Sequence, residues 1–291
     1  MLRFAWLWFL VRVLGRLPAR SGVVIANIGG TLTWYASPRV RHVTGDHMRH
    51  VLGPLSKQRD RDRAARGCVR AAARYYADFA RTPHLPHSAA FDEIESIEGL
   101  EHWFEAYDRG CGLIVCSAHL GNPEYFVRAT AQLGFNLMVL TEPLSPPRVN
   151  QFVHRMRAAP GARFVPVSLT AVREAIAHLR SGGVLAILGD RDILHNGHPT
   201  VLFGERARLP TGAIDLALRT GAPVLPAFVV RTEEGRFRVH IEPAFTLTRS
   251  KDREADLDAG MRMMAAALEK GIRRAPDQWF PLQPVWSGLA L

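Results

Sequence analysis

The chain has 291 residues, 47% of them apolar, and a mean hydropathy of -0.03, values that exclude a disordered chain and a polytopic membrane protein. Lys and Arg number 37 against 27 Asp and Glu, and a formal net charge of +10 indicates an anionic partner: nucleic acid, an anionic membrane surface or a phosphorylated substrate. Only three cysteines occur, without a CxxC pair, so neither a disulfide framework nor a zinc site is indicated.

The first 40 residues predict an amphipathic segment that associates with a membrane. Their apolar run at residues 4–11 is shorter than a membrane span of about 20 residues. A signal peptide would need a small-residue cleavage site, which Arg16 and Pro18 disrupt; an ordinary packed helix is the other alternative. Aromatic bulk and two arginines on one helical face favour an interfacial anchor, carried by Trp6, Trp8, Phe9, Arg12 and Arg16.

A second apolar patch at residues 21–36 would extend that surface, although the Gly29-Gly30 pair argues against a single rigid span. Residues 38–80 then predict helices, because apolar and aromatic residues recur at intervals of three and four.

From residue 112 onward, short apolar runs alternate with helical patterns. This alternation is typical of an α/β domain with a mostly parallel central sheet flanked by helices. The runs expected to form strands are GLIVCSA, NLMVLTEP, ARFVPVS, GVLAILGDRD, PVLPAFVVR and FRVHIEPAF; the segment HNGHPTVLFGERARLPTG is expected to be a loop. No repeat or linker divides this region, so we expect a membrane-associating segment at residues 1–40 and a single α/β domain at residues 41–291.

The sequence HLGNPE at residues 119–124 joins the first of these strands to a helix. Asn122 is a favourable N-cap, Pro123 a favourable first helical residue, and Glu124 falls in the first turn. Reactive groups in α/β sheets gather at the carboxyl ends of strands. With a turn between them, His119 and Glu124 can fold toward each other, so that the carboxylate orients the imidazole as a general base; capping and surface roles for both residues are the alternative.

Other catalytic motifs are missing from the sequence. It contains no G-x-S-x-G, P-loop, G-x-G-x-x-G after a strand, or HExxH, and no Ser or Cys is placed for covalent catalysis. This pattern favours direct attack by a substrate hydroxyl that His119 activates. His195 and His198 lie in a Gly/Asn-rich loop and are expected to be exposed to solvent, so no metal site is predicted.

Four blocks resemble the glycerolipid and lysophospholipid acyltransferase superfamily, in the branch of the lipid A late acyltransferases and the phosphatidylinositol mannoside acyltransferases. HLGNPE resembles the H-x4-(D/E) motif, and LGDRD at residues 188–192 resembles that branch's D-(R/Q)-D block. Residues 201–231 and the terminal PDQWFPLQPVW are similar to two further blocks, in the family's order. TEPL at residues 141–144 occupies the place of a second-motif Glu of the mannoside branch.

The resemblance implies transfer of a fatty acyl chain to a hydroxyl of a glycolipid, either phosphatidylinositol mannoside-like or lipid A-like. It implies acyl-CoA or acyl carrier protein as donor substrate, no other cofactor, and a peripheral location at the cytoplasmic face of the bacterial plasma (inner) membrane. In this chain His119 would be the general base and Glu124 its orienting partner. The residues expected to bind substrate are Glu142, Asp190, Arg191, Asp192, Glu205, Thr211 and Gly212. Capping and local ion pairs are the alternative for Asp190, Asp192 and Thr211.

Two other functions compete with this interpretation. A soluble α/β thioesterase or hydrolase could use His119 to activate water. An arginine-rich nucleic-acid-binding protein would fit the charge, but the arginines are scattered over many helices and no basic motif with interleaved aromatic residues is present. The expected partners are therefore a membrane lipid surface, an acyl thioester donor and a glycolipid acceptor, with no nucleic acid.

Overall fold

The computed structural model describes residues 11–13, 15–86, 88–157 and 160–286. The predicted aromatic anchor of Trp6, Trp8 and Phe9 lies outside the described residues. The division at residue 40 stays a prediction.

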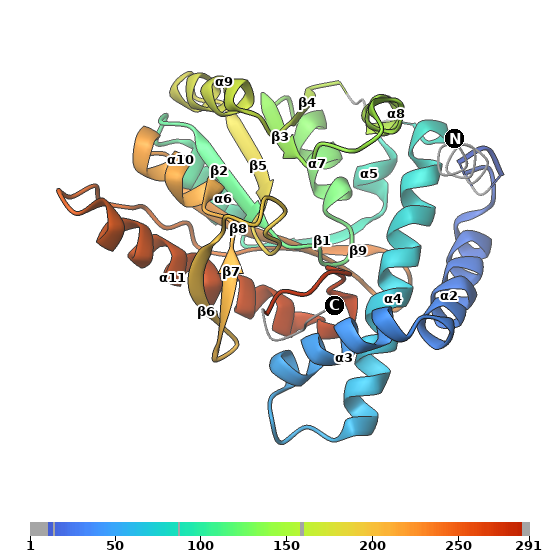
Figure 1. Ribbon diagram of the computed structural model, residues 1–291. Coiled ribbons are helices and arrows are strands. Elements are labelled where there is room, and N and C mark those ends of the chain that lie inside the picture. Colours follow the sequence, from blue (N-terminus) through green and yellow to red (C-terminus); the bar gives the residue numbers. More distant parts are fainter. Residues whose placement is uncertain (1–10, 14, 87, 158–159, 287–291) are drawn as a thin grey trace.

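A seven-stranded sheet forms the centre of the fold, in the order β1-β9-β8-β2-β5-β3-β4 (Figure 1). All neighbouring strands run parallel except β8 and β9, so the expected mostly parallel sheet is confirmed. Its strands are β1 (Ile94–Glu98), β2 (Leu113–Ser117), β3 (Leu137–Thr141), β4 (Ala162–Pro166), β5 (Val184–Leu188), β8 (Val224–Arg231) and β9 (Phe237–Ile241).

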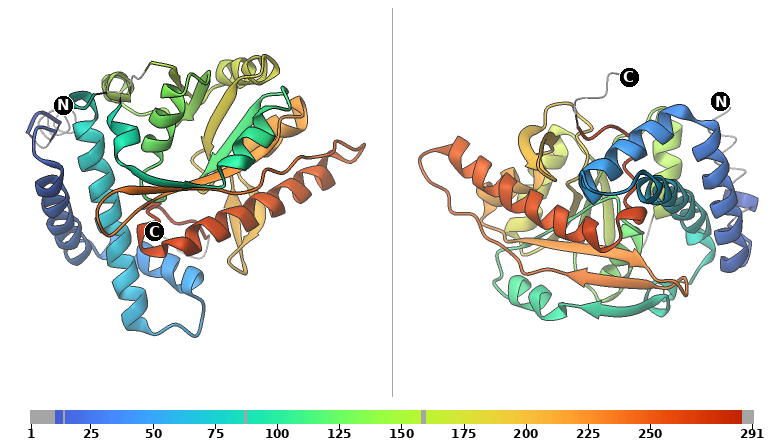
Figure 2. Two further views of the ribbon diagram at one scale, coloured as in Figure 1. Left: turned by 180° about the vertical axis from the view of Figure 1, so that it is seen from behind. Right: turned by 90° about the horizontal axis from the view of Figure 1, so that it is seen from below.

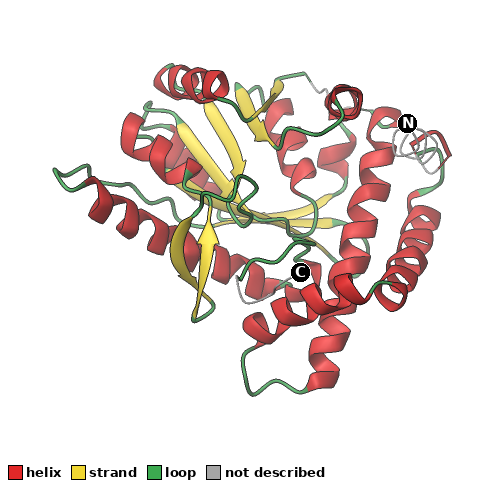
Figure 3. Cartoon of the chain, viewed as in Figure 1, coloured by secondary structure: helices red, strands yellow, loops and turns green. Residues whose placement is uncertain are grey.

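Helices cover both faces of the sheet, because successive side chains of a strand point to opposite faces. One core cluster joins the sheet to α5 (Ala89–Asp92), α6 (Leu100–Tyr107) and α7 (Pro123–Gln132). The other joins it to α9 (Leu169–Arg180), α10 (Gly212–Thr220) and the long α11 (Arg253–Arg274), as Figures 2 and 3 show from different sides. Helix α8 (Pro147–Arg157) packs near the end of α4.

Helices α2 (Ala19–Ala36), α3 (Pro38–Leu52) and α4 (Gln58–Arg81) stand together at one side of the sheet (Figures 1 and 2). The Gly29-Gly30 pair does not interrupt α2. Gly30 instead allows close packing, since a Cβ built there would lie 2.8 Å from Arg70 Cα of α4. The helices expected over residues 38–80 are confirmed. No helix in the described part of the chain is long and apolar enough to cross a bilayer.

Two strand features differ from the expectation. The segment expected to be a loop contains a hairpin of β6 (His198–Leu202) and β7 (Glu205–Leu209), antiparallel and separate from the main sheet. Its apolar residues are too few and too widely spaced to stand out in the sequence, yet Leu202, Ala207 and Leu209 enter the core. Strand β1 was also not expected, because IESIE is short and only its first residue is buried.

Candidate active site

The site begins where β2 and β5 end side by side. Their parallel register pairs Ser117 with Leu188, the last residue of each strand. His119 and Asp190 each follow two residues later, so both reach the carboxyl edge of the sheet at neighbouring positions. This edge is where α/β sheets collect their reactive groups.

Asp190 holds the imidazole of His119. His119 Nδ1 lies 2.8 Å from Asp190 Oδ1, and the backbone N–H of His119 donates to Oδ2 at 2.9 Å. Trp279 Nε1 donates to the same Oδ2, also at 2.9 Å. Asp190 is fully buried, while the His119 side chain keeps 21% of its surface exposed. The carboxylate thus fixes one ring nitrogen as a donor and leaves Nε2 to accept a proton.

The electrostatics of Asp190 agree with an ionised partner. Burial by itself would raise its pKa, but the attraction of His119 and the hydrogen bonds from His119 and Trp279 outweigh burial and hold the pKa below its ordinary value. The carboxylate therefore stays charged, and an anion in this place would stabilise a protonated imidazole.

The C-terminal segment fixes the backbone that carries His119. Phe280 N–H donates to His119 O at 2.8 Å, and Gly121 N–H donates to Gln278 O at 3.1 Å. Gly121 has φ 58°, and a Cβ built there would lie 2.0 Å from Val229 O of β8. Only glycine fits this close approach, so the loop is pressed between β8 and the C-terminal segment.

The expectation that Glu124 orients His119 is wrong for this structure, because Asp190 occupies the Nδ1 position. Glu124 Oε1 instead accepts from Tyr75 Oη at 3.0 Å and from Arg157 Nε at 2.8 Å. The expected cap is confirmed: Asn122 Oδ1 accepts from Glu124 N–H at 3.2 Å, at the start of α7. Glu124 therefore ties α7 to α4 and α8.

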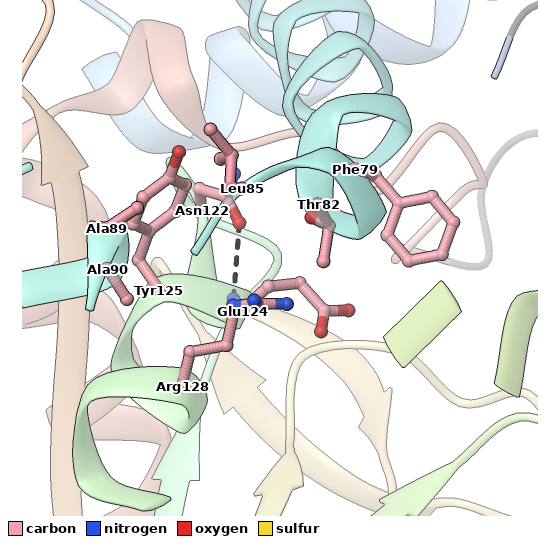
Figure 4. A pocket seen from close by; sticks show the side chains of 9 residues that line it. All are labelled: Phe79, Thr82, Leu85, Ala89, Ala90, Asn122, Glu124, Tyr125 and Arg128. Carbon is pink, nitrogen blue, oxygen red and sulfur yellow. Dashed lines mark hydrogen bonds between the residues drawn. The ribbon is translucent and has the colours of Figure 1, made fainter. Parts of the chain in front are cut away.

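Glu124 also borders a small cavity, shown in Figure 4. Arg128 lies beside it on α7, and the opposite walls come from α4 and α5. His119 is not among the lining residues, which are Phe79, Thr82, Leu85, Ala89, Ala90, Asn122, Glu124, Tyr125 and Arg128.

Arg191 and Glu142 form an ion pair at the same edge of the sheet. Glu142 directly follows β3, which pairs with β5, and Arg191 follows Asp190. The Nε of Arg191 is buried and has no hydrogen-bond partner among the described residues. A guanidinium with an unused donor can still bind a carbonyl or phosphate oxygen.

The other expected substrate-binding residues are occupied by local contacts. Asp192 accepts from the backbone N–H of Asn196 and Gly197, at 3.2 and 2.8 Å, and shapes their loop. Glu205 binds His50 Nε2 at 2.7 Å and so fastens the hairpin to α3. These contacts fit a structural role better than substrate binding.

Thr211 and Gly212 stand at the start of α10. Thr211 Oγ1 donates to Asp215 Oδ2 at 2.8 Å, which leaves the first backbone N–H groups of the helix without a side-chain cap from Thr211. A Cβ built on Gly212 would lie 3.1 Å from Ile187 of β5, so this helix start lies against the end of that strand.

His195 is exposed as expected, whereas His198 is half-buried and its Nε2 lies 2.5 Å from Asp258 Oδ1. Within the described ranges, no group of three or more His, Cys, Asp or Glu side chains could hold a metal ion.

Sequence reasoning missed Trp279, Tyr75 and Arg157 and gave Asp190 another role. The block PDQWFP contains Trp279, but nothing in its letters shows that the indole reaches Asp190, 89 positions away. Tyr75 and Arg157 lie on α4 and α8 in ordinary amphipathic patterns. The signal that could have found Asp190 was its place two residues after a buried strand.

Comparison with known proteins identifies the relatives of this chain. The model of the bacterial lipid A biosynthesis acyltransferase family matches residues 1–287. The chain is 27% identical to a phosphatidylinositol mannoside acyltransferase of Mycobacterium tuberculosis, over 73% of this chain and 67% of the relative. A protein of the same name from Mycolicibacterium smegmatis is 24% identical, over 77% of this chain and 73% of the relative. The chain therefore belongs to the bacterial lipid A biosynthesis acyltransferase family and is an acyltransferase of the lipid A and phosphatidylinositol mannoside type.

Proposed function

We propose that this protein transfers a fatty acyl chain from a thioester donor to a hydroxyl of a phosphatidylinositol mannoside-like glycolipid, with His119 as general base. The observation that carries the proposal is the bond between His119 Nδ1 and buried Asp190, which leaves Nε2, on a side chain that is 21% exposed, free to act as a base. Asp190 takes the orienting role, and Glu124 positions α7 through Tyr75 and Arg157.

In the proposed reaction, His119 Nε2 takes the proton of the acceptor hydroxyl while its oxygen attacks the thioester carbonyl. A new C–O ester bond forms and the C–S bond breaks, and the imidazolium returns the proton to the departing sulfur. Asp190 stabilises the transient imidazolium. General-base catalysis of this kind contributes about 10²–10⁴-fold to a rate.

Two neighbouring groups are suited to the anionic parts of the substrates. The Arg191 guanidinium, on a side chain that is 17% exposed, offers donors to a phosphate or carbonyl oxygen, with Glu142 holding it in place. The start of α10 at Thr211 and Gly212 offers backbone N–H groups to the thioester oxyanion. Asp192 and Glu205 are left out of this proposal because local contacts occupy both.

The acceptor class is inferred from relatives that are named phosphatidylinositol mannoside acyltransferases, and a lipid A-like acceptor is the alternative suggested by the family description. The donor is either acyl-CoA or acyl carrier protein. No cofactor beyond this donor is proposed.

We place the enzyme peripherally at the cytoplasmic face of the plasma membrane. Helix α2 supports a membrane contact, because large apolar side chains face solvent along it at helical spacing: Val24, Ile25, Ile28, Leu32 and Tyr35. We call this set the α2 stripe. Arg16, Arg20 and Arg39 near the ends of α2 are exposed and suit anionic lipid head groups.

The test compares His119→Ala with His240→Ala in a transfer assay. His240 is a matched control on β9, away from the HLGNPE loop. Its Nδ1 also lies 2.8 Å from a carboxylate oxygen, which belongs to Glu98 of β1. With palmitoyl-CoA as donor and phosphatidylinositol dimannoside or lipid A precursor as acceptor, we expect His119→Ala to lower kcat by about 10³-fold or more. His240→Ala keeps kcat near that of the wild type. Retained transfer by His119→Ala contradicts the general-base role.

A further inference from the structure

A buried carboxylate on α4 contacts the HLGNPE loop from outside the motif. Asp78 is 3% exposed, and its Oδ2 accepts from Asn122 Nδ2 at 2.9 Å. The guanidinium of Arg231, at the end of β8, forms an ion pair with the same oxygen. Asp78 lies 44 positions before Asn122 and 153 before Arg231, so these contacts exist only in the folded chain.

The contact with Asn122 sets the orientation of its amide. Because Nδ2 is bound by Asp78, Oδ1 must turn toward Glu124 N–H, which it caps. Asn122 stands between His119 and Glu124, three residues after the proposed base. Asp78 thereby controls the turn in which the chain leaves His119 and enters α7.

The contact with Arg231 connects Asp78 to the C-terminal segment, which holds the backbone of His119. Arg231 N–H donates to Gln278 Oε1, and Gln278 Nε2 donates to Arg231 O, both at 2.8 Å. The residue after Gln278 is Trp279, whose indole binds Asp190. The Asp78 carboxylate is therefore connected to His119 through Asn122, and to Asp190 through Arg231 and the C-terminal segment.

Burying a charge in this way costs free energy unless its partners are kept. Burial raises the pKa of Asp78 above its ordinary value, and the ion pair with Arg231 and the Asn122 hydrogen bond offset only part of that rise. Removing the carboxylate leaves Arg231 without its anion and Asn122 without its acceptor. Both groups then gain freedom to reorient.

We infer that Asp78 is a positioning residue for acyl transfer, which holds the HLGNPE loop and the C-terminal segment in the geometry that His119 and Asp190 need. This inference rests on the proposed function. Asp78 acts through Asn122 and Arg231 and takes no part in bond making. Displacing a catalytic group by about 1 Å can cost on the order of 10²-fold in rate.

The experiment exchanges the two partners of the 2.9 Å hydrogen bond, using Asp78→Asn, Asn122→Asp and the double variant. Asp is as good an N-cap as Asn, so the double variant keeps the cap of α7 and restores one carboxylate facing one amide. Glu242→Gln is the matched control, because Glu242 is also a buried carboxylate bound by two cations, Lys270 and Arg274, away from the loop.

The readouts are kcat and KM with palmitoyl-CoA and phosphatidylinositol dimannoside, together with circular dichroism melting curves. We expect each single variant to lower kcat by about 10- to 100-fold with KM for palmitoyl-CoA nearly unchanged. The double variant recovers about tenfold through the restored contact with position 122, as expected for coupled residues, whereas the part of the loss that depends on the Arg231 ion pair stays, because position 78 is neutral. Glu242→Gln lowers the melting temperature but keeps kcat.

Wild-type kcat in folded Asp78→Asn overturns the inference, and so does a folded double variant that recovers nothing over Asn122→Asp. The comparison of the double variant with Asn122→Asp tests the inference even when Asp78→Asn does not fold. If the proposed function itself is wrong, the wild-type protein does not acylate the glycolipid, a result that differs from both of these outcomes.

Discussion

At the scale of single residues, the chemistry of this site depends on which carboxylate reaches His119. Asp190 binds both the ring Nδ1 and the backbone N–H of His119, whereas Glu124 binds a tyrosine and an arginine. The two acidic residues therefore have separable roles. In the proposed mechanism Asp190 acts on His119 directly, and Glu124 stabilises the helix α7.

This separation predicts different effects for two isosteric substitutions. Asp190→Asn cannot accept from Nδ1, the backbone N–H and Trp279 with a single oxygen, and it favours the wrong imidazole tautomer. We expect kcat to fall by about 10³–10⁴-fold. Glu124→Gln keeps an acceptor for Tyr75 and Arg157 but loses the charge, so we expect the free energy of unfolding to fall by about 2 kcal/mol and kcat to fall far less.

Steady-state kinetics and urea unfolding of both variants provide the measurement. Equal losses of kcat in Asp190→Asn and Glu124→Gln would contradict the assignment of Asp190 as the orienting residue.

At the scale of elements, α2 has two unlike faces. Small residues and one tryptophan, Gly22, Ala26, Gly30 and Trp34, are buried. The α2 stripe faces solvent on the rest of the helix, which packs mainly on α4 among the described residues. An apolar stripe beside exposed arginines is typical of a helix that lies in a membrane interface.

The stripe leads to a prediction for vesicle binding. The double substitution Ile28→Glu and Leu32→Glu should lower partitioning into anionic phosphatidylglycerol vesicles by about tenfold or more, since each apolar side chain is worth about 1.5–3 kcal/mol on leaving water. Both side chains are more than half exposed, so the melting temperature should change little.

Leu169→Glu serves as control, because Leu169 is 86% exposed on α9, which lies across the molecule from α2 (Figure 1). Vesicle sedimentation measures the partitioning. Unchanged binding by the α2 variant, or an equal loss in Leu169→Glu, would exclude the α2 stripe as the docking surface.

At the scale of the whole molecule, α3 and the C-terminal segment form a buried support beneath the site. The His47 ring lies 5.0 Å from the ring of Trp279 and 5.7 Å from that of Trp286. Its Nε2 has no hydrogen-bond partner in the described residues. Burial, together with the neighbouring His50, lowers the pKa of His47 from 6.5 to about 3.

This lowered pKa predicts a pH dependence of stability. The unfolded chain binds a proton at His47 near pH 6.5 and the folded chain only near pH 3, so stability is lost as the pH falls between these values. At pH 5 the contribution of His47 is a loss of about 2 kcal/mol relative to neutral pH.

Urea unfolding at pH 7.5 and pH 5 tests this expectation. His47→Leu should reduce the difference between the two pH values, whereas His84→Leu, at an exposed histidine, should leave it unchanged. An identical pH difference in wild type and His47→Leu would mean that this imidazole does not control acid stability.

The sequence predicted the helices, the buried strands and the motif that starts at His119, because these depend on local periodicity and on capping residues such as Asn122 and Pro123. It did not predict β1 or the β6–β7 hairpin, whose short polar segments become strands through their neighbours. Family resemblance added the reaction class, which local patterns alone do not specify.

Local sequence determined that His119 and Asp190 each stand just beyond a strand. Only the tertiary structure decided that β2 and β5 are neighbours in the sheet, which brings these two residues within 2.8 Å, and that β3, with Glu142 after it, lies beyond β5. Trp279 and Asp78 likewise reach the site only through packing. The physical reason is that periodicity along the chain records which face of an element is buried, whereas strand order arises from packing among segments far apart in sequence.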